Sequence, residues 1–443
     1  MSTIRYTESS MSEAIVSPSS AGPARADARP VLEPSRLSLL PLYIVIFSGF
    51  VGYSLMITVF TPMIIKGETA MVAADAPMAH KTILLGFLLS IYPLGQFIGS
   101  PIMGSLSDRF GRKPVLLISL TITTLCYGVV AAAMALGNFA LLTTALLICG
   151  LAEANIVTAQ SAIADVIPPE ERNRFFGYIY MSVSSAFIIG PLAGGKLADR
   201  SLSPWFGYPT PFWTVMGLLA LLTITTAIVF VETNPPQSRH PVSYLEAFTN
   251  LAGVVLNRRL RSLYWINFLF YFAIYGFFRS YPMYLVDEFH MGVSRVSEFI
   301  AWVGLPIVLS NVWLTGFVSA RVNIRNLTFW SALLTGIFAI SIVIPRPVGA
   351  LWVTLFLTSA SLAMCLPSCA TLLSVAAGET DQGRVMGNNQ ALQVGAEALS
   401  SMAGGAIAAI MVKLTLVVLG VVAIVAALCV PLIAAGSPDK PSR

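Results

Sequence analysis

Charged residues are scarce in this chain. Of its 443 residues, 26 are Lys or Arg and 21 are Asp or Glu, so 11% are charged, whereas 56% are hydrophobic and the mean hydropathy is +0.78. A soluble domain carries roughly a quarter charged residues, and this sequence has too few to cover a soluble core. The scarcity of charge therefore excludes an ordinary soluble protein and predicts an integral membrane protein.

Histidine and cysteine are also rare, and their positions exclude most kinds of site chemistry. His80, His240 and His290 all fall in expected loops, so a Ser–His pair or a histidine metal site within the membrane is excluded. The five cysteines lie in apolar runs; Cys365 and Cys369 are one helical turn apart, but a zinc site needs four ligands. We expect no enzyme activity, no metal, no cofactor and no disulfide framework.

Clustered basic residues and a signal peptide are missing as well. The net charge of +5 comes from residues scattered singly between apolar stretches, which argues against a nucleic-acid partner. Residues 1–36 are rich in Ser, Pro and Arg, and the first apolar run begins only near Leu37, too late for a signal peptide. We expect residues 1–36 to form a disordered cytoplasmic tail.

What the chain has in abundance is long apolar runs, each roughly long enough to cross a bilayer as a helix. They cover residues 37–64, 82–106, 114–136, 139–165, 175–198, 210–231, 262–286, 297–320, 326–344, 348–376, 384–411 and 414–435. The tightest spacer lies around Lys413. The runs predict an all-α membrane protein with twelve transmembrane helices.

Basic residues predict the orientation of these helices. Most of them fall in the amino-terminal stretch, in the even-numbered loops and at the carboxyl terminus. Because cytoplasmic loops carry an excess of Lys and Arg, both termini are expected in the cytoplasm.

The longest connection divides the runs six and six. We expect a six-helix bundle over 37–231, a cytoplasmic central loop over 232–261, a second six-helix bundle over 262–436 and a cytoplasmic tail over 437–443.

Three short stretches recur at equivalent places in the two halves. GSLSDR (104–109) aligns with GFVSAR (316–321) at an offset of 212, and RFFG (174–177) with RVMG (384–387) and LAGG (192–195) with MAGG (402–405) at an offset of 210. Such matches predict an internal repeat. Paired six-helix halves are typical of transporters, with the site at their interface.

The stretch GSLSDRFGRKP, residues 104–114, gathers four charges in one short loop. It is not a nucleotide-binding P-loop, because Pro114 follows Lys113 where a hydroxyl residue is required. A solvated cytoplasmic loop would explain Arg112 and Lys113, but it would not explain Gly104, Asp108 and Gly111 at these spacings.

The loop resembles the signature Gly-x-Leu-x-Asp-Arg-x-Gly-Arg-Lys-Pro of the major facilitator superfamily. The matching positions are Gly104, Leu106, Asp108, Arg109, Gly111, Arg112, Lys113 and Pro114. The resemblance implies a secondary transporter with two pseudo-symmetric six-helix bundles that works by alternating access. It also implies that Asp108 and Arg109 bridge neighbouring helix ends at a cytoplasmic gate, where a carboxylate favours a helix N-terminus. Ala320 stands where the second half would need the matching Asp.

GPLAGG, residues 190–195, resembles a Gly-Pro element of span five that is found mainly in antiporters and exporters. Its defining residues are Gly190, Pro191, Gly194 and Gly195. Glycine allows helices to approach closely and proline bends a helix, so a simple packing motif is an equal alternative. These motifs resemble the drug:proton antiporter branch, which includes tetracycline-resistance-like proteins. The chain departs from that branch at Leu146, where an Arg is usual, and in residues 47–62, which contain no acid.

Two acids lie within apolar spans and are candidate proton carriers. Glu153 is in span four, with Gln160 two turns on; Glu397 is in span eleven, on a stripe with Gln390, Gln393 and Ser401 at helical spacing. Ionisable groups inside a bilayer are costly and usually functional. Burial favours the neutral form of a carboxyl group, which allows it to load and release a proton.

Arg279 in span seven is the basic counterpart, with Tyr271 and Tyr275 at four-residue steps before it. A guanidinium can hold a substrate carboxylate or phosphate through two hydrogen bonds. The alternative is a static bridge between Arg279 and one of the buried acids. The tyrosines suit packing as well as ligand contact. We count Arg279, both tyrosines and the three glutamines as candidate substrate-cavity residues.

These features predict proton-coupled efflux of a small organic molecule across a bacterial inner membrane. The alternative within transport is proton-coupled or facilitated uptake of an anionic metabolite, and a transporter-like receptor is the alternative of a different class. The expected partners are a small-molecule substrate, protons and membrane lipid, and the protein is expected to be a monomer.

Overall fold

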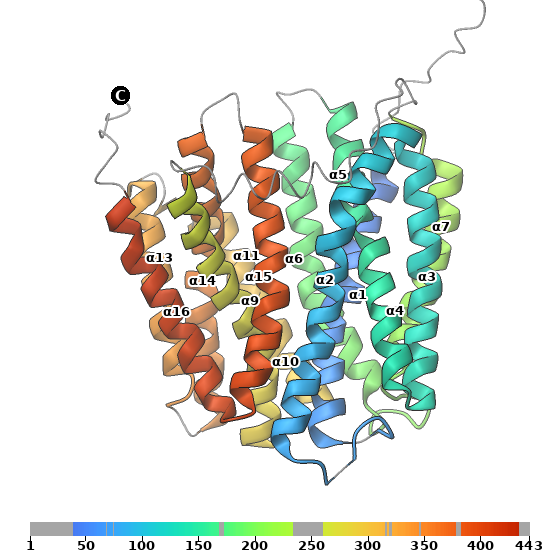
Figure 1. Ribbon diagram of the computed structural model, residues 1–443, viewed down its shortest axis with the longest axis horizontal. Helices are drawn as coiled ribbons and strands as arrows, with labels where there is room; N and C mark the ends of the chain where they lie inside the picture. Colours follow the sequence, from blue (N-terminus) through green and yellow to red (C-terminus); the bar gives the residue numbers. More distant parts are fainter. Residues whose placement is uncertain are drawn as a thin grey trace, which may run out of the picture. The chain divides into compact units, whose positions relative to one another are not determined.

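The computed structural model describes residues 39–67, 69–73, 75–167, 172–233, 260–314, 317–318, 321–344, 347–377 and 382–433. The expected tails, 1–36 and 437–443, and nearly all of the expected central loop, 232–261, lie outside these residues. Every regular element within the described residues is a helix (Figure 1).

Helices of the first half follow the predicted runs closely. They are α1 (Leu40–Lys66), α2 (Met78–Phe110), α3 (Arg112–Leu136), α4 (Phe139–Glu153), α5 (Asn155–Val166), α6 (Arg172–Ala198) and α7 (Thr210–Val229). The run predicted over 139–165 is divided, because the chain makes a turn at Ala154 between α4 and α5.

The second half contains α9 (Arg261–Phe289), α10 (Val293–Trp302), α11 (Gly304–Leu309), η2 (Ser310–Leu314), α13 (Ile324–Ser341), α14 (Val348–Ala377), α15 (Gln382–Ala408) and α16 (Val412–Ile433). The run predicted over 297–320 is broken: α10 ends at Trp302, α11 follows, and η2 is a short π-helix. The break expected around Lys413 lies just before it, since α16 already begins at Val412.

Hydropathy marks most of these helices as membrane-spanning. Within the described residues, nine helical stretches are long and apolar enough to cross a bilayer. They lie in α1, α2, α3, α4 with α5, α6, α7, α13, α14 and α16. The helices α9 and α15 are not among them, and these two carry Arg279 and Glu397.

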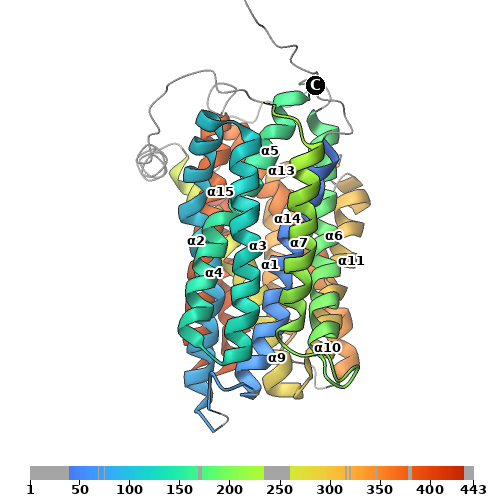
Figure 2. The same cartoon turned by 90° about the vertical axis from the view of Figure 1, so that its right-hand side faces the viewer.

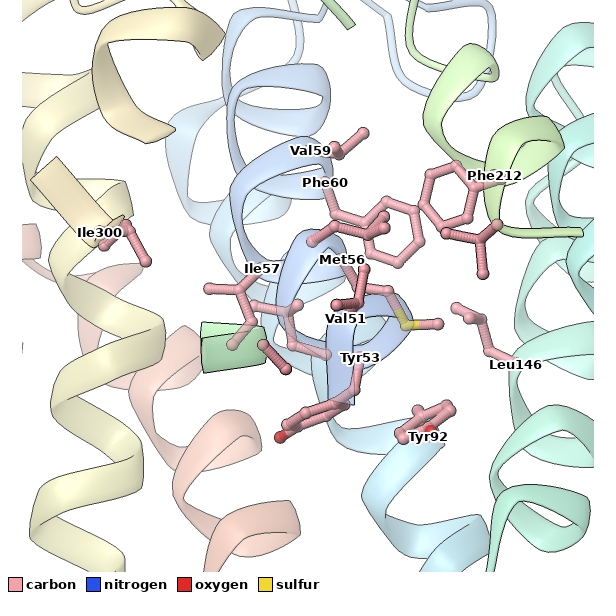
Figure 3. Close-up of a cluster of buried hydrophobic side chains, with 14 of the residues drawn as sticks. Val51, Tyr53, Met56, Ile57, Val59, Phe60, Tyr92, Leu146, Phe212 and Ile300 are labelled. Carbon is pink, nitrogen blue, oxygen red and sulfur yellow. The ribbon is translucent and has the colours of Figure 1, made fainter. Parts of the chain in front are cut away.

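Within the first half, α1 is the central helix and is the most enclosed. It packs against α6, α7 and α2, while α3 packs against α4 and α7. Figure 2 shows α3 and α7 side by side on one flank. The apolar core beside α1 includes the stacked rings of Phe60 and Phe212, whose centroids lie 5.4 Å apart (Figure 3). In the second half, α9 packs against α15 and α16, and α13 against α14 and α16.

Three pairs of helices form most of the contacts between the halves: α2 with α15, α6 with α10, and α1 with α9. The first two pairs are called seams below (Figure 1). The glycines predicted from the repeat lie at these seams. A Cβ on Gly195 of α6 would stand 2.2 Å from the Cβ of Ser297 in α10, and a Cβ on Gly405 of α15 would stand 2.6 Å from the carbonyl oxygen of Thr82 in α2. Both close contacts lie towards the bundle end that carries the α1–α2 and α9–α10 connections, so the halves are tightly closed there.

Candidate functional site

Glu153, the last residue of α4, is buried among phenol groups. Its side chain is 2% exposed. Tyr92 of α2 donates a hydrogen bond to Oε2, and Tyr127 of α3 donates to the same oxygen at 3.4 Å. Oε1 is buried and has no hydrogen-bond partner among the described residues. No Lys or Arg in the described part of the chain forms an ion pair with this acid.

Close helix packing places these phenols around the carboxyl group. A Cβ on Gly150 of α4 would lie 2.1 Å from the carbonyl oxygen of Tyr92, so only glycine lets α2 approach α4 this closely. A Cβ on Gly52 of α1 would lie 2.1 Å from the hydroxyl of Tyr127. The acid is therefore enclosed by α1, α2 and α3 through close helix packing.

Glu397 is the second buried acid, and it is paired with Arg279. The Arg279 Nη2 atom lies 3.1 Å from Glu397 Oε1, and the two side chains are 2% and 8% exposed. Tyr53 of α1 donates to Glu397 Oε1 and accepts from Arg279 Nη2. Arg279 therefore pairs with one of the two buried acids, and Tyr53 joins the pair from the opposite half.

A small cavity lies between the two acids. Three aromatic side chains, Tyr53, Phe60 and Tyr92, line it together with Arg279 and four aliphatic side chains, so it is apolar with one charged group. The Arg279 Nε atom is buried and has no hydrogen-bond partner among the described residues. The space is about the size of one water molecule, so this conformation has no room for an organic ligand there.

The other predicted cavity residues form polar contacts between α9 and α15. Asn389 donates to the hydroxyl of Tyr271 at 2.7 Å and accepts from Asn267 at 2.9 Å. Gln393 donates to the hydroxyl of Tyr275 at 2.5 Å. Two predicted glutamines stand apart from this set. Gln390 is exposed, and Gln160 lies on α5, separated from Glu153 by the turn at Ala154.

Arg112 is the buried charge of GSLSDRFGRKP, with 7% exposure. Its guanidinium contacts Asp108 at 2.6 Å and Ser107 at 2.7 Å, and its Nε lies 2.9 Å from Asp165 at the end of α5. The predicted bridge between helix ends therefore runs through Arg112, whereas the Arg109 guanidinium lies 5.1 Å from the centroid of the Phe110 ring.

The two glycines of GSLSDRFGRKP differ in their surroundings. Gly111 has φ +94°, a conformation that favours glycine, and Gly104 faces open space. The carboxylate at the N-terminus of α3 is not Asp108, which lies in the last turn of α2. It is Glu232, which accepts from the backbone nitrogens of Arg112 at 2.8 Å and Lys113 at 3.0 Å.

GPLAGG packs α6 against two different helices. Cβ atoms on Gly190 and Gly194 would collide with Ser54 and Leu55 of α1, and a Cβ on Gly195 would collide with α10 in the other half. Pro191 lies inside α6. The packing interpretation therefore describes what these glycines do in this conformation.

Within the described residues, no group of three His, Cys, Asp or Glu side chains is arranged to hold a metal ion.

Comparison with known families identifies the chain. The family model of the Major Facilitator Superfamily matches residues 42–393 and 263–443. The chain belongs to the major facilitator superfamily. The predicted resemblance is confirmed, and with it the prediction of a multi-pass membrane transporter.

Similar proteins of known name are drug-resistance proteins. The chain is 26% identical to the class C tetracycline resistance protein of Escherichia coli over 69% of this chain and 75% of that protein. It is 25% identical to the quinolone resistance protein NorA of Staphylococcus aureus over 76% of this chain and 81% of that protein. These similarities support the predicted efflux function.

Solved structures share the superfamily fold. The human organic anion transporter MFSD10 aligns with a TM-score of 0.65 at 18% identity, covering 88% of this chain and 99% of that chain. A bacterial homologue of the lysosomal transporter Spinster, in an inward-facing conformation, aligns with a TM-score of 0.70 at 15% identity, covering 90% and 96%.

Sequence reasoning missed the tyrosines that bond to the two buried acids and the two asparagines between α9 and α15. Tyr53, Tyr92 and Tyr127 lie in apolar runs, where a tyrosine is usually assigned to packing. A small residue on a facing helix is the sequence feature that could have indicated such a tyrosine, as Gly52 of α1 faces the hydroxyl of Tyr127.

Proposed function

We propose that this chain is a proton-coupled efflux antiporter that spans the membrane twelve times and moves a small organic molecule by alternating access between two six-helix bundles. Both termini lie in the cytoplasm, and the membrane is a bacterial inner membrane. The relatives' names, which specify tetracycline and quinolone resistance, support an organic drug-like substrate.

One observation carries the proton coupling: Glu153 is buried without a basic partner in the described residues. A carboxylate without a cation is expensive inside a membrane, so its neutral form is favoured until water or a donor network reaches it. Tyr92 and Tyr127 provide donors for the ionised form. Glu397 is the weaker candidate, because Arg279 already neutralises it.

Alternating access requires the seams to open and close. The close contacts of Gly195 and Gly405 support a conformation closed at one end of the bundle. At the opposite end, we assign the Arg112 network with Asp108 and Asp165 as the cytoplasmic gate. Opening the first end would separate α6 from α10 and α2 from α15.

Uptake of an anionic metabolite is the second candidate, and Arg279 is the observation that favours it. Its guanidinium is engaged by Glu397, so an anion would have to displace this carboxylate. The apolar lining of the adjoining cavity favours a neutral or weakly polar molecule over an anion. The efflux proposal therefore stands first.

Flux measurements in proteoliposomes test the proposal, with tetracycline and a quinolone as probes. We expect an imposed pH gradient to drive probe accumulation, with protons moving in the opposite direction. Glu153→Gln should abolish this accumulation while leaving probe exchange intact. Glu288→Gln, which removes an exposed acid at the end of α9, serves as the control and should leave both unchanged.

Three outcomes contradict the proposal in different ways. Probe flux that ignores the pH gradient removes proton coupling. Proton and probe movement in the same direction, lost selectively in Arg279→Ala for anionic compounds, supports uptake. A folded protein that moves none of the probes removes efflux of these compound classes.

A further inference from the structure

Two tyrosines connect the buried acid of the first half to the ion pair of the second half. Tyr92 donates to Glu153, and Tyr53 bonds to both Arg279 and Glu397. The rings of Tyr53 and Tyr92 are stacked, with centroids 5.2 Å apart and an interplanar angle of 23°. Figure 3 shows the two rings next to one another at one end of the apolar cluster along α1.

The hydroxyl of Tyr53 forms hydrogen bonds with both members of the ion pair. Its proton goes to Glu397 and its oxygen accepts from Arg279, so it bonds to two charged groups at once. Hydrogen bonds to ionised groups are about twice as strong as neutral ones. The Arg279 guanidinium also lies 5.7 Å from the centroid of the Tyr53 ring. The position of the ring therefore follows the state of the ion pair.

The hydroxyl of Tyr92 is committed to Glu153 in a comparable way. An ionised carboxylate accepts this bond strongly, and a protonated one accepts it less strongly. Protonation of Glu153 thus weakens the contact that fixes the Tyr92 ring. A displacement of that ring acts directly on Tyr53, because the two rings are stacked.

We propose that the Tyr53–Tyr92 stack couples the protonation of Glu153 to the Arg279–Glu397 ion pair, with both tyrosines acting as positioning residues. The proposal rests on the proposed function, since it takes Glu153 as the proton carrier. Coupling between two sites is reciprocal, so breaking the ion pair must also change the proton affinity of Glu153.

The cavity gives this coupling a role in transport. Tyr53, Tyr92 and Arg279 all line it. The space is about the size of one water molecule, so a substrate could enter only by displacing the same two rings that respond to Glu153. Substrate occupancy and protonation would then act through shared side chains, which is the physical requirement for exchanging one for the other.

The groups around each acid define what else can contribute. Among the described residues, the titratable groups facing Glu153 are Tyr92 from α2, Cys126 and Tyr127 from α3, and Cys149 from α4. Those facing Glu397 are Tyr53 from α1 and Tyr275 and Arg279 from α9. The rings of Tyr53 and Tyr92 meet between these two sets.

Infrared difference spectroscopy of the purified full-length protein tests the proposal without a substrate. A pH step reveals the band of a protonated carboxyl group, and its loss in Glu153→Gln assigns that band to Glu153. The titration midpoint of the band is then measured in Tyr53→Phe, which keeps the ring and removes only the hydroxyl. We expect the midpoint to move by about one pH unit, a tenfold change in proton affinity.

Two further variants separate coupling from general disturbance. Glu397→Gln should displace the Glu153 midpoint in the wild-type background but not in the Tyr53→Phe background, because the link is already cut. Tyr284→Phe is the control. It removes the hydroxyl of a buried tyrosine in α9, which donates to the carbonyl of Ile342 at 3.4 Å, and it should leave the midpoint unchanged.

The outcomes distinguish this inference from the proposed function. If the Glu153→Gln variant keeps the carboxyl band, Glu153 is not the titrating group and the proposed proton carrier fails. If the band belongs to Glu153 but Tyr53→Phe leaves its midpoint in place, the coupling fails while the carrier stands. Equal displacements by Glu397→Gln in both backgrounds also overturn the coupling.

Discussion

Lys196 at the end of α6 donates to Glu298 of α10 at 2.7 Å and to Ser294 of the same helix at 2.6 Å. This pair crosses between the two halves one residue beyond Gly195. Polar and steric contacts therefore close the same seam. The ion pair is partly exposed, with side-chain exposures of 42% and 30%, so its contribution should be smaller than that of the glycine contact.

We expect Glu298→Gln to weaken closure of this seam only slightly. A partly exposed ion pair contributes about 0–1 kcal/mol, which corresponds to at most about a fivefold change in the open-to-closed ratio. Distances between spin labels on α6 and α10 measure the ratio. Glu298 also pairs with Arg295 of its own helix at 2.8 Å, so Arg295→Gln is the matched control and should leave the ratio unchanged. Equal shifts in the two variants would contradict the assignment.

Gly195→Val and Gly405→Val should hinder closure much more. The added side chains meet Ser297 in α10 and Thr82 in α2, and overpacking of this kind costs about 1–3 kcal/mol. Spin-label distances should shift towards the open state, and probe transport should fall by about tenfold or more. Gly217→Val is the matched control, because a Cβ there meets no atom within 4 Å. Unchanged distances in the first two variants would remove the glycines from the gate.

Sequence reasoning identified these glycines as part of a repeat, but it predicted neither their place at the seams nor the tyrosine links. The repeat LAGG and MAGG placed Gly195 and Gly405 at equivalent positions, and small residues are typical where helices approach closely. The partners of Tyr53 and Tyr92 are 344 and 61 residues distant along the chain. A tyrosine in an apolar run carries no sign of a partner that distant.

Helix breaks were predictable only in part. The apolar runs predicted most helix ends, because the thickness of the hydrocarbon core sets the length of a membrane-spanning helix. Gly304 and Pro306 interrupt the second half's broken run and are visible in the sequence. The turn at Ala154 has no glycine or proline to mark it. The cap of α3 could not be predicted either, because Glu232 is separated from Arg112 by 120 positions in the sequence and from Lys113 by 119.

Single substitutions of the Arg279–Glu397 pair should destabilise the protein more than the double substitution. Removing one partner leaves a buried charge unpaired, at a cost of about 3–5 kcal/mol, whereas an apolar pair removes both charges. We expect Arg279→Met and Glu397→Leu each to lower Tm strongly, and the combination to recover most of the loss. Thermal unfolding in detergent measures this difference.

Transport by the same double variant separates the two interpretations of Arg279. If probe flux recovers with stability, the pair is a static bridge. If stability recovers while flux stays absent, the charges act in transport. Equal Tm values for the single and double variants would contradict the ion pair itself.

Arg112→Ala should lower Tm, whereas Arg109→Ala should not. Both substitutions remove one positive charge from the same loop, but only Arg112 is buried and bonded to Asp108 and Asp165. Loss of such hydrogen bonds costs about 1–3 kcal/mol, and exposed substitutions usually cost less than about 0.5 kcal/mol. Thermal shift measurements compare the two directly, and equal losses would assign the effect to net charge.

The two seams differ in the stiffness of the helices that form them. Both helices of the α2–α15 seam are continuous, with 33 and 27 residues. The α6–α10 seam joins a continuous helix to one that ends at Trp302 and is followed by α11 and a π-helical turn. Helix breaks and π-turns bend more easily than an unbroken helix. The α6–α10 side thus contains a break in the helical chain, whereas Pro93 and Pro101 of α2 lie inside an unbroken helix. Because the two sides of the transport path are built differently, the pseudo-equivalent halves need not move through equal angles.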